Sequence, residues 1–439
     1  MDATATAVEG RIPPGPPESY DPRQDLLGWM QLNFDRFGDI YRATIYGGEV
    51  YVVSSPEYAE HVLLGNWRNF LRKGQAVKRI ALSLGNGLIS SNGEFWVSQR
   101  RMIQPAFRRE AVAALRDVFL KPNIALAEKW KQAARAGESV DVTRDVSLAV
   151  LEVTLLSIFG DDYDKVAGQF HIIAEESRNM EFAQTCSALS KTIVRIAERR
   201  RSTHNDAEDI LGIMMRSRDR DTGQSMPDVQ LAREALTLVI AGHETTASVL
   251  NWIWYLLSQH PLVETKVFAE IDALLGDELP TMATLGRYTH TRRVIEEALR
   301  SYPPLWLMTR KAINPDRLGE YLVPAKTEVY ISPFLLQRHP RLWQNPQLFD
   351  PDRFAGDPPA LEESADPHRL AMCPFGAGPR NCIGEFFARV EMQIHLLTIA
   401  RELRLQFAQA GPAEYLAGVN LLSRHHFIAT PEIRGRHVH

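Results

Sequence analysis

The most informative stretch of the sequence is Phe375-Gly-Ala-Gly-Pro-Arg-Asn-Cys-Ile-Gly384, a glycine-rich loop that presents one cysteine directly before a helical segment. A buried thiolate needs stabilisation, and the N-terminus of a helix supplies unpaired backbone N–H groups and a positive dipole. Small residues let those N–H groups approach the sulfur closely. An isolated cysteine in such a turn is more often a small packed thiol. Here the surrounding pattern favours a stabilised thiolate at Cys382.

A long apolar helix is predicted upstream, from Pro227-Asp228 to just before His260-Pro261. The whole helix, of about 30 residues, would extend over roughly 45 Å, and its apolar part, residues 235–257, is long enough to cross a bilayer. In that case Glu244 and His243 would lie at the centre of the bilayer, and no basic loops flank the segment. We therefore expect a helix that runs through a protein core, and no membrane anchor.

The rest of the pattern is mostly helical, with short strands towards both ends. Residues 41–54 alternate around Gly47-Gly48, which is typical of a two-stranded hairpin with a glycine turn. The other expected helical segments are 94–207 with breaks at Pro105, Pro122, Gly137 and residues 160–162, then 263–276, 290–301 and 384–407, with a strand-and-turn region up to Phe354. This predicts a mainly α (α+β) fold, with an extended Pro-rich lead-in at residues 1–18 and a single domain at residues 19–439.

The composition is that of an ordinary globular protein, with 439 residues, 45% of them hydrophobic and 24% charged. A formal net charge of -4 supplies no basic field for nucleic acid or an anionic membrane. The cysteines Cys186, Cys373 and Cys382 are too few for a disulfide framework, and the N-terminus lacks a signal-peptide pattern, so we expect a cytoplasmic protein. The spacing of Cys373 to Cys382 matches neither zinc nor iron–sulfur sites, which predicts a packed thiol at Cys373.

The cysteine loop resembles the haem-binding signature of the cytochrome P-450 family, Phe-x-x-Gly-x-Arg-x-Cys-x-Gly. The matching positions are Phe375, Gly378, Arg380, Cys382 and Gly384. The resemblance implies the cytochrome P-450 fold, with a long central helix over a haem b (iron protoporphyrin IX) and with small β-sheets. It also implies that Cys382 is the proximal iron ligand and that Phe375 packs near the sulfur. A thiolate ligand pushes electron density onto iron and favours O–O cleavage.

A second motif lies within the long helix, at Ala241-Gly-His-Glu-Thr-Thr246. It is similar to the family's Ala/Gly-Gly-x-Asp/Glu-Thr segment over the distal face of the haem, which implies that Glu244 relays protons and that Thr245 holds water or dioxygen. Thr246 points about 100° away around the helix and is the weaker candidate, and we assign His243 no catalytic role. The alternative is a structural helix whose threonines bond back to the carbonyl four residues earlier and whose Glu reaches a surface.

Supporting motifs follow the same resemblance. Glu297 and Arg300 lie one turn apart, and Arg353 in Pro351-Asp-Arg-Phe354 should reach the same carboxylate as a structural lock. Candidate partners of the haem propionates are Trp96, Arg100, Arg310 and Arg380. Arg101, Arg108 and Arg109 suggest a basic patch on the proximal face. One departure is Gln337, where many relatives have histidine or tyrosine.

The function that this resemblance implies is a haem-thiolate monooxygenase, which hydroxylates or epoxidises a hydrophobic small molecule with one oxygen atom of O2. The chain shows no flavin or iron–sulfur module, so we expect a ferredoxin and an NAD(P)H-dependent ferredoxin reductase as electron donors, and a monomer. Two alternatives stay open: a peroxide-using or hydroperoxide-rearranging enzyme of the same fold, and a non-catalytic haem sensor. Terpenoids, steroids, polyketides and fatty acids are the candidate substrates. The expected pocket lining comprises parts of the segments 70–89 and 163–189, together with Val239, Ala241, Leu305, Leu307 and Leu421.

Overall fold

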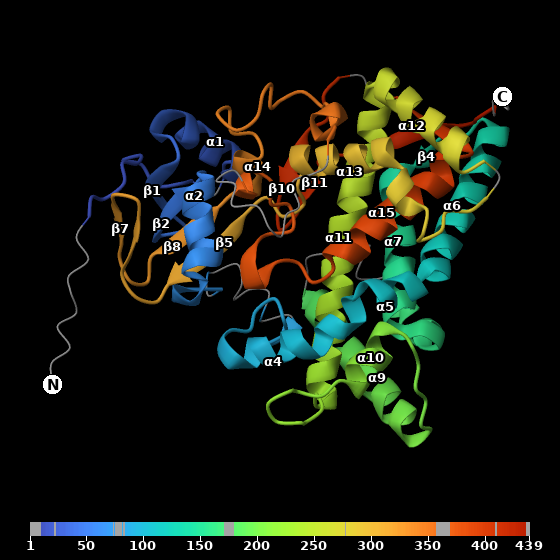
Figure 1. The fold of residues 1–439 in the computed structure, drawn as a ribbon, viewed down its shortest axis with the longest axis horizontal. Coiled ribbons are helices and arrows are strands. Elements are labelled where there is room, and N and C mark those ends of the chain that lie inside the picture. Colours follow the sequence, from blue (N-terminus) through green and yellow to red (C-terminus); the bar gives the residue numbers. More distant parts are fainter. Residues whose placement is uncertain are drawn as a thin grey trace.

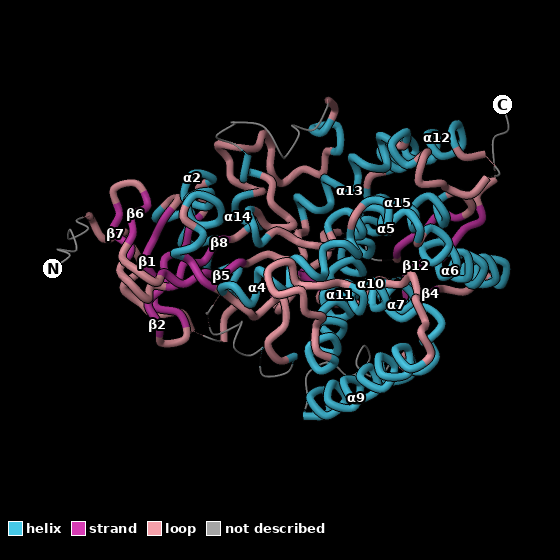
Figure 2. Tube along the Cα trace, turned by 60° about the horizontal axis from the view of Figure 1, so that its bottom comes forward, coloured by secondary structure: helices cyan, strands magenta, loops and turns pink. Residues whose placement is uncertain are grey.

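The computed structural model describes most of the chain, namely residues 10–21, 23–72, 74, 81, 84–170, 180–276, 278–356, 369–408 and 411–435, without the side chains of 180–184 and 369. Parts of the expected pocket segments 70–89 and 163–189 lie outside these residues. In the view of Figure 1 the strands near the N-terminus gather on one side and most helices on the other. Figure 2, turned by 60°, keeps this division, with β4 and β12 as strands among the helices. The mainly α fold is therefore confirmed.

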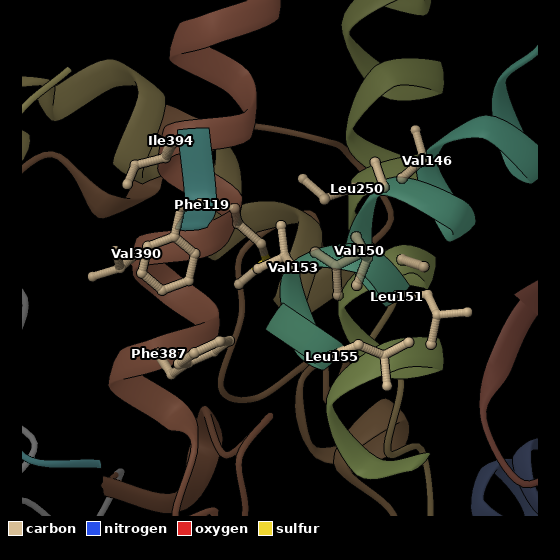
Figure 3. Packing of buried hydrophobic residues seen from close by; sticks show 14 of the residues in the cluster. Phe119, Val146, Val150, Leu151, Val153, Leu155, Leu250, Phe387, Val390 and Ile394 are labelled. Carbon is tan, nitrogen blue, oxygen red and sulfur yellow. The ribbon is translucent and has the colours of Figure 1, made fainter. Parts of the chain in front are cut away.

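The helical part is built on four helices that contact one another. They are α6 (Arg116–Ala136), α7 (Val142–Phe159), α11 (Asp228–Gln259) and α15 (Glu385–Ala400). Figure 3 shows their shared apolar core, in which Phe119 of α6 meets Phe387 of α15, with ring centroids 4.9 Å apart, while Val150 of α7 lies near Leu250 of α11. Close packing of such side chains is the main source of helix stability in proteins.

The 32-residue helix α11 confirms the predicted long helix with its predicted ends. Its second half is buried almost completely from Thr246 to Leu257, as expected for a helix that runs through a core. In the part of the chain that the structure describes, no helix is both long and apolar enough to span a membrane. The expected helices near residues 263–276 and 290–301 are α12 (Pro261–Leu274) and α13 (Thr289–Ser301).

The largest sheet has the strand order β1-β2-β8-β5-β3. Its strands are β1 (Ile40–Ile45), β2 (Gly48–Val53), β3 (Phe70–Leu71), β5 (Met308–Ala312) and β8 (Glu328–Ile331). The predicted hairpin is β1–β2, with Ile45 opposite Gly48. Its turn lies one residue earlier than expected, at Tyr46 and Gly47, which both have positive φ, 50° and 76°. Two consecutive residues with positive φ match the right-handed twist of the strands.

Three smaller sheets complete the β structure. They are β6 (Asp316–Leu318) with β7 (Tyr321–Val323), β10 (Tyr415–Ala417) with β11 (Leu421–Ser423), and β4 (Val140–Asp141) with β12 (Ile428–Ile433) and β9 (Leu403–Phe407). The remaining helices are α1 (Leu26–Phe37), α2 (Pro56–Glu60), α4 (Gly93–Ile103), α5 (Arg109–Ala114), α9 (Met180–Ser202), α10 (Ile210–Arg216) and α14 (Pro333–Leu336). A π-helical turn at His61–Gly65 follows α2 directly.

Two boundaries differ from the sequence prediction. Pro122 does not break a helix, because it lies inside α6, whose start follows the single residue Leu115 after α5. Burial of Phe119 and Trp130 along α6 outweighs the hydrogen bond that the proline removes. The last predicted helix ends at Ala400 and not at Phe407, because the alternating Leu403 and Leu405 pair with β12 as strand β9.

Candidate active site

The cysteine loop is shaped by two glycines with positive φ, Gly376 at 74° and Gly378 at 69°. A Cβ atom on Gly378 would lie 2.2 Å from the carbonyl oxygen of Leu63 in the π-helical turn, so a larger residue does not fit there. The Cys382 backbone N–H donates to the Phe375 carbonyl at 2.8 Å, which closes the loop. Cys382 therefore lies just ahead of α15, as the loop sequence predicts.

The Cys382 side chain is accessible, although protein surrounds the sulfur closely enough for burial to raise the pKa of its thiol. The backbone N–H of Gly384 donates to this sulfur and acts in the opposite direction. Glu385 raises the thiol pKa further, whereas the positive charges of Arg100 and Arg72 lower it. A backbone donor and two nearby guanidinium groups are the surroundings that a thiolate ligand requires.

Four guanidinium groups gather near the thiol, from Arg72 after β3, Arg100 on α4, Arg310 on β5 and Arg380 in the cysteine loop. Burial lowers the pKa of Arg310 well below its usual value, and the charges of Arg72 and Arg380 lower it further. Burial likewise lowers the pKa of Arg380 to about 9, helped by Arg72 and Arg100. Within the described ranges, none of the four forms an ion pair with a carboxylate. A half-buried cluster of like charges calls for an anion, and two carboxylates of a ligand would supply it.

Arg100 of α4 bonds to the cysteine loop, and Arg380 of that loop bonds back to the start of α4. Arg100 donates to the Asn381 carbonyl at 2.8 Å and to the Asn381 side-chain oxygen at 2.9 Å. Arg380 donates to the Ser91 carbonyl at 2.8 Å, and its guanidinium lies 4.0 Å from the ring centroid of Trp96. The structure thus brings together the residues predicted to meet the propionates, although Trp96 contacts Arg380 directly and not Arg100. Arg72 belongs to this cluster too, but no sequence motif pointed to it.

The motif on α11 has an accessible face in the middle of the helix. Ala241 is exposed and Glu244 and Thr245 are half-buried, whereas the following turns are buried. The Thr245 hydroxyl donates to the Ala241 carbonyl at 2.6 Å, the back-bond that a purely structural threonine would also form. This bond leaves the hydroxyl oxygen as an acceptor on the accessible face. The Glu244 carboxylate accepts a hydrogen bond from the Asn420 amide, a partner that the sequence did not indicate.

The other residues of this motif pack against the protein core. His243 contacts Ser147 of α7, with its Nε2 2.8 Å from the Ser147 hydroxyl. Thr246 is 3% exposed and points into the core, in agreement with the rotation expected from one helical step. A Cβ atom on Gly242 would lie 3.4 Å from the Thr154 methyl, so α7 approaches α11 closely at this glycine.

The predicted lock around Glu297 is assembled as expected. Arg300 donates to both carboxylate oxygens at 2.6 and 2.8 Å, and Arg353 donates to one of them at 3.1 Å. Glu297 and Arg300 are both 0% exposed. The group lies behind the loop, since Arg300 also donates to the carbonyl of Gln337, and Gln337 in turn contacts Cys373.

Of the five residues expected to line a substrate pocket, three offer accessible surface. Ala241 is exposed, and Leu305 and Leu307 are half-buried. Val239 is 1% exposed and Leu421 is 0% exposed, because both are packed within hydrophobic clusters. These two residues stabilise the walls of the site and present no surface to a ligand.

All three arginines of the expected basic patch are exposed, and Arg108 and Arg109 lie near the start of α15. Arg108 and Arg109 are both exposed, and the Arg109 guanidinium lies 4.9 Å from the ring centroid of Phe386, four residues after Cys382. Arg101 is also exposed but pairs with Asp221 at 2.7 Å, which neutralises it. The patch is therefore Arg108 and Arg109.

Comparisons with known proteins agree with this geometry. The family model for Cytochrome P450 matches residues 19–175 and 166–421. Cyclooctatin synthase of Streptomyces melanosporofaciens is 31% identical over 84% of this chain and 83% of its own length, and pentalenene oxygenase of Streptomyces avermitilis is 29% identical over 84% of each. The crystal structure of the cytochrome P450DA heme domain superimposes with a TM-score of 0.83 at 26% identity, covering 97% of this chain and 98% of that one. This chain belongs to the cytochrome P450 family.

Membership of this family makes the chain a P450 monooxygenase with haem as its cofactor. The residues present fit that group. An accessible thiol with a backbone donor suits an iron ligand, and the arginine cluster, which has no carboxylate partner among the described residues, suits the two propionates. The described residues contain no group of three or more His, Cys, Asp or Glu side chains that could hold a metal ion by themselves.

Proposed function

We propose that this monooxygenase holds a haem b through Cys382 and inserts one oxygen atom of O2 into a hydrophobic small molecule, with terpenoids as the first candidate class. Two relatives support the substrate class by their names, pentalenene oxygenase and cyclooctat-9-en-7-ol 5-monooxygenase, the latter 31% identical over 84% of this chain. An alkene and an alkenol offer few polar groups to a pocket. The accessible Ala241, Leu305 and Leu307 are apolar and suit such a ligand.

The observation that carries the proposal is the environment of Cys382. The Gly384 N–H and the positive charges of Arg100 and Arg72 all favour the thiolate form of a sulfur that is otherwise desolvated. When bound, the haem would supply the iron at which O2 is activated, and the Cys382 thiolate would hold that iron and donate electron density to it. The role of Arg72, Arg100, Arg310 and Arg380 is to pair with the propionates and so to orient the group.

On α11, Glu244 and Thr245 form the proposed path of proton transfer. The Glu244 carboxyl exchanges protons with solvent, and the Thr245 oxygen accepts a hydrogen bond from a water molecule. Their proximity on one accessible stretch of helix supports this assignment. Glu297, Arg300 and Arg353 stabilise the fold behind the loop and take no part in the chemistry.

Electrons come from outside the chain in this proposal, from a ferredoxin reduced by an NAD(P)H-dependent reductase. The exposed Arg108 and Arg109 beside the start of α15 suit an acidic partner, because complementary charges increase the rate of encounter. We propose further that the enzyme acts as a cytoplasmic monomer.

The test combines ligation, binding and turnover. The reduced protein with carbon monoxide should show a red-shifted Soret band, Cys382→Ser should lose it, and the control Cys373→Ser should keep it. Spin-state shifts upon addition of terpenoids, steroids, polyketides and fatty acids should then identify a ligand, which a ferredoxin and reductase should convert into an oxygenated product. Loss of the red-shifted Soret band in Cys373→Ser alone would refute Cys382 as the iron ligand. A small molecule that binds but yields no oxygenated product would refute the proposed reaction.

A further inference from the structure

The hairpin of β10 and β11 lies against α11 and forms two side-chain hydrogen bonds with this helix. The Asn420 amide donates to the Glu244 carboxylate, and the Ser248 hydroxyl donates to the Leu421 carbonyl at 2.6 Å. Glu244 and Ser248 are four residues apart and so share one face of the helix, while their partners are consecutive in the hairpin. The end of the hairpin therefore follows the axis of α11.

The position of Asn420 is fixed independently of Glu244. The Leu421 N–H donates to the Pro304 carbonyl at 3.0 Å, and the indole N–H of Trp306 donates to the Gly418 carbonyl at 2.9 Å. Trp306 is 4% exposed, so this bond joins the hairpin to a buried anchor. The amide thus meets the carboxylate as a donor that is already held in place. Donors of this kind orient a carboxylate without an ordering cost at the time of reaction.

We propose that Asn420 is a positioning residue for Glu244, and that the hairpin tip at residues 418–420 couples substrate binding to proton delivery. The proposal rests on the role of Glu244 in the proposed function. The same hairpin is bonded to residues 304 and 306, which flank Leu305 of the proposed pocket lining, and Val419 at its tip is 75% exposed. A substrate that displaces the 304–307 segment or the tip therefore shifts the donor of Glu244 as well.

Three variants test the proposal. Asn420→Ala removes the donor, so kcat should fall severalfold with little change in KM, and more of the consumed electrons should appear as hydrogen peroxide. Asn420→Asp places two carboxyl groups in contact, which share a proton, so the pH profile of product formation should move as well. Adding Glu244→Gln to Asn420→Asp restores one carboxylate and one amide, and should recover part of the lost coupling.

Ser248→Ala is the matched control, because it loosens the same hairpin without touching Glu244. It should increase hydrogen exchange of residues 415–423 as much as Asn420→Ala does, yet keep the parental product yield per electron pair. If Ser248→Ala uncouples as strongly as Asn420→Ala, or if Asn420→Ala remains fully coupled, the positioning role is refuted.

A second measurement does not depend on turnover. In a double-mutant cycle on urea unfolding, Glu244→Ala and Asn420→Ala should lower the midpoint by less together than the sum of their separate effects. Additive effects would show that the two side chains do not stabilise each other and would overturn the proposal, even in a parent that oxygenates its substrate. An interacting pair in a parent that forms no product would instead contradict the proposed function alone.

Discussion

The side-chain oxygen of Gln337 accepts a hydrogen bond from the backbone N–H of Cys373 at 3.1 Å. The amide nitrogen of the same side chain donates to the carbonyls of Leu299 and Arg300, at 2.9 and 3.0 Å. Gln337 is 0% exposed. One buried amide thus joins the end of α13, which carries the Glu297 lock, to Cys373, two residues before the cysteine loop. The residue that departs from the family pattern has a structural role here.

Gln337→Met should destabilise the protein strongly, because it preserves volume and apolar contact but leaves three buried backbone groups without partners. An unsatisfied buried group costs about 1–3 kcal/mol, so the free energy of unfolding should fall by about 3 kcal/mol or more. Urea unfolding measures this. Gln406→Met, at an exposed strand position where the amide bonds Glu432, is the control and should change stability little. A Gln337 variant as stable as its control would contradict this account of the amide.

Thr245→Ala should uncouple oxygen activation from product formation, because the variant loses the hydroxyl that holds a water molecule on the proposed proton path. Consumption of the electron donor should continue while hydrogen peroxide increases and the yield of product per electron pair falls, by about tenfold if the hydroxyl contributes about 1.4 kcal/mol. Thr246→Ala is the control, since that side chain is buried in the core. An unchanged product yield in Thr245→Ala would assign this hydroxyl to helix structure alone.

The features that could be predicted from the sequence are those with a local cause. The helix Asp228–Gln259 has a periodic sequence between two prolines, and the backbone of the cysteine loop requires Gly376 and Gly378. The local sequence therefore predicts both the helix and the loop. Asn420, Arg72 and Gln337 acquire their roles through contacts with residues 36 or more positions away in the sequence, which no local pattern encodes. The helix break predicted at Pro122 failed for the same reason, because tertiary packing outweighed a local preference.

Arg72→Gln should weaken haem retention without destabilising the haem-free protein. Without haem, removing one of four mutually repelling cations should leave the free energy of unfolding unchanged or higher. With haem, losing a charge-assisted hydrogen bond to a propionate should speed haem loss about tenfold, which corresponds to about 1.4 kcal/mol. Haem transfer to an excess of a haem-free acceptor protein measures the rate.

Arg101→Gln is the control. It removes a cation that is paired with Asp221 at the surface, and should change neither the free energy of unfolding nor the rate of haem loss. Equal haem retention in Arg72→Gln and Arg101→Gln would place Arg72 outside the propionate site.

Glu234 makes stability depend on pH. It is 0% exposed, its carboxylate accepts from the Leu88 N–H and the Gln230 amide, both at 2.8 Å, and burial raises its pKa from 4.5 to about 7. Between those values the folded protein holds a proton that the unfolded chain has lost, so the group's contribution is complete below pH 4.5 and is lost as the pH rises through 7. The loss amounts to about 3 kcal/mol.

Glu234→Gln removes this ionisation while keeping a polar side chain of the same size. The stability of the variant relative to the parent should therefore increase from pH 5 to pH 8, by up to about 3 kcal/mol. Urea unfolding at a series of pH values measures it, with Glu208→Gln as an exposed control. A parallel pH dependence in parent and Glu234→Gln would show that Glu234 ionises as it does in the unfolded chain.

Arg108 and Arg109 should affect electron delivery, whereas Arg100 should affect the cofactor. Arg108→Glu with Arg109→Glu reverses two exposed charges beside the start of α15, so reduction by an acidic ferredoxin should slow while haem binding is kept. Raising the ionic strength should slow reduction of the parent in the same way, because exposed charges are screened beyond about 8 Å at 0.15 M salt. The double variant should show little further dependence on salt.

Arg100→Ala serves as the contrasting variant in that experiment, since its guanidinium is bonded to Asn381 inside the loop and does not face a partner protein. It should weaken haem retention and leave the salt dependence of reduction as in the parent. Stopped-flow reduction rates against ionic strength for the three proteins separate the two roles. Charges in a small transient interface act mainly on the rate of encounter, so the double variant should differ most at low salt and converge with the parent at high salt. Reduction of the double variant at the parental rate at every salt concentration would remove Arg108 and Arg109 from the docking surface and direct the search to another face of the enzyme.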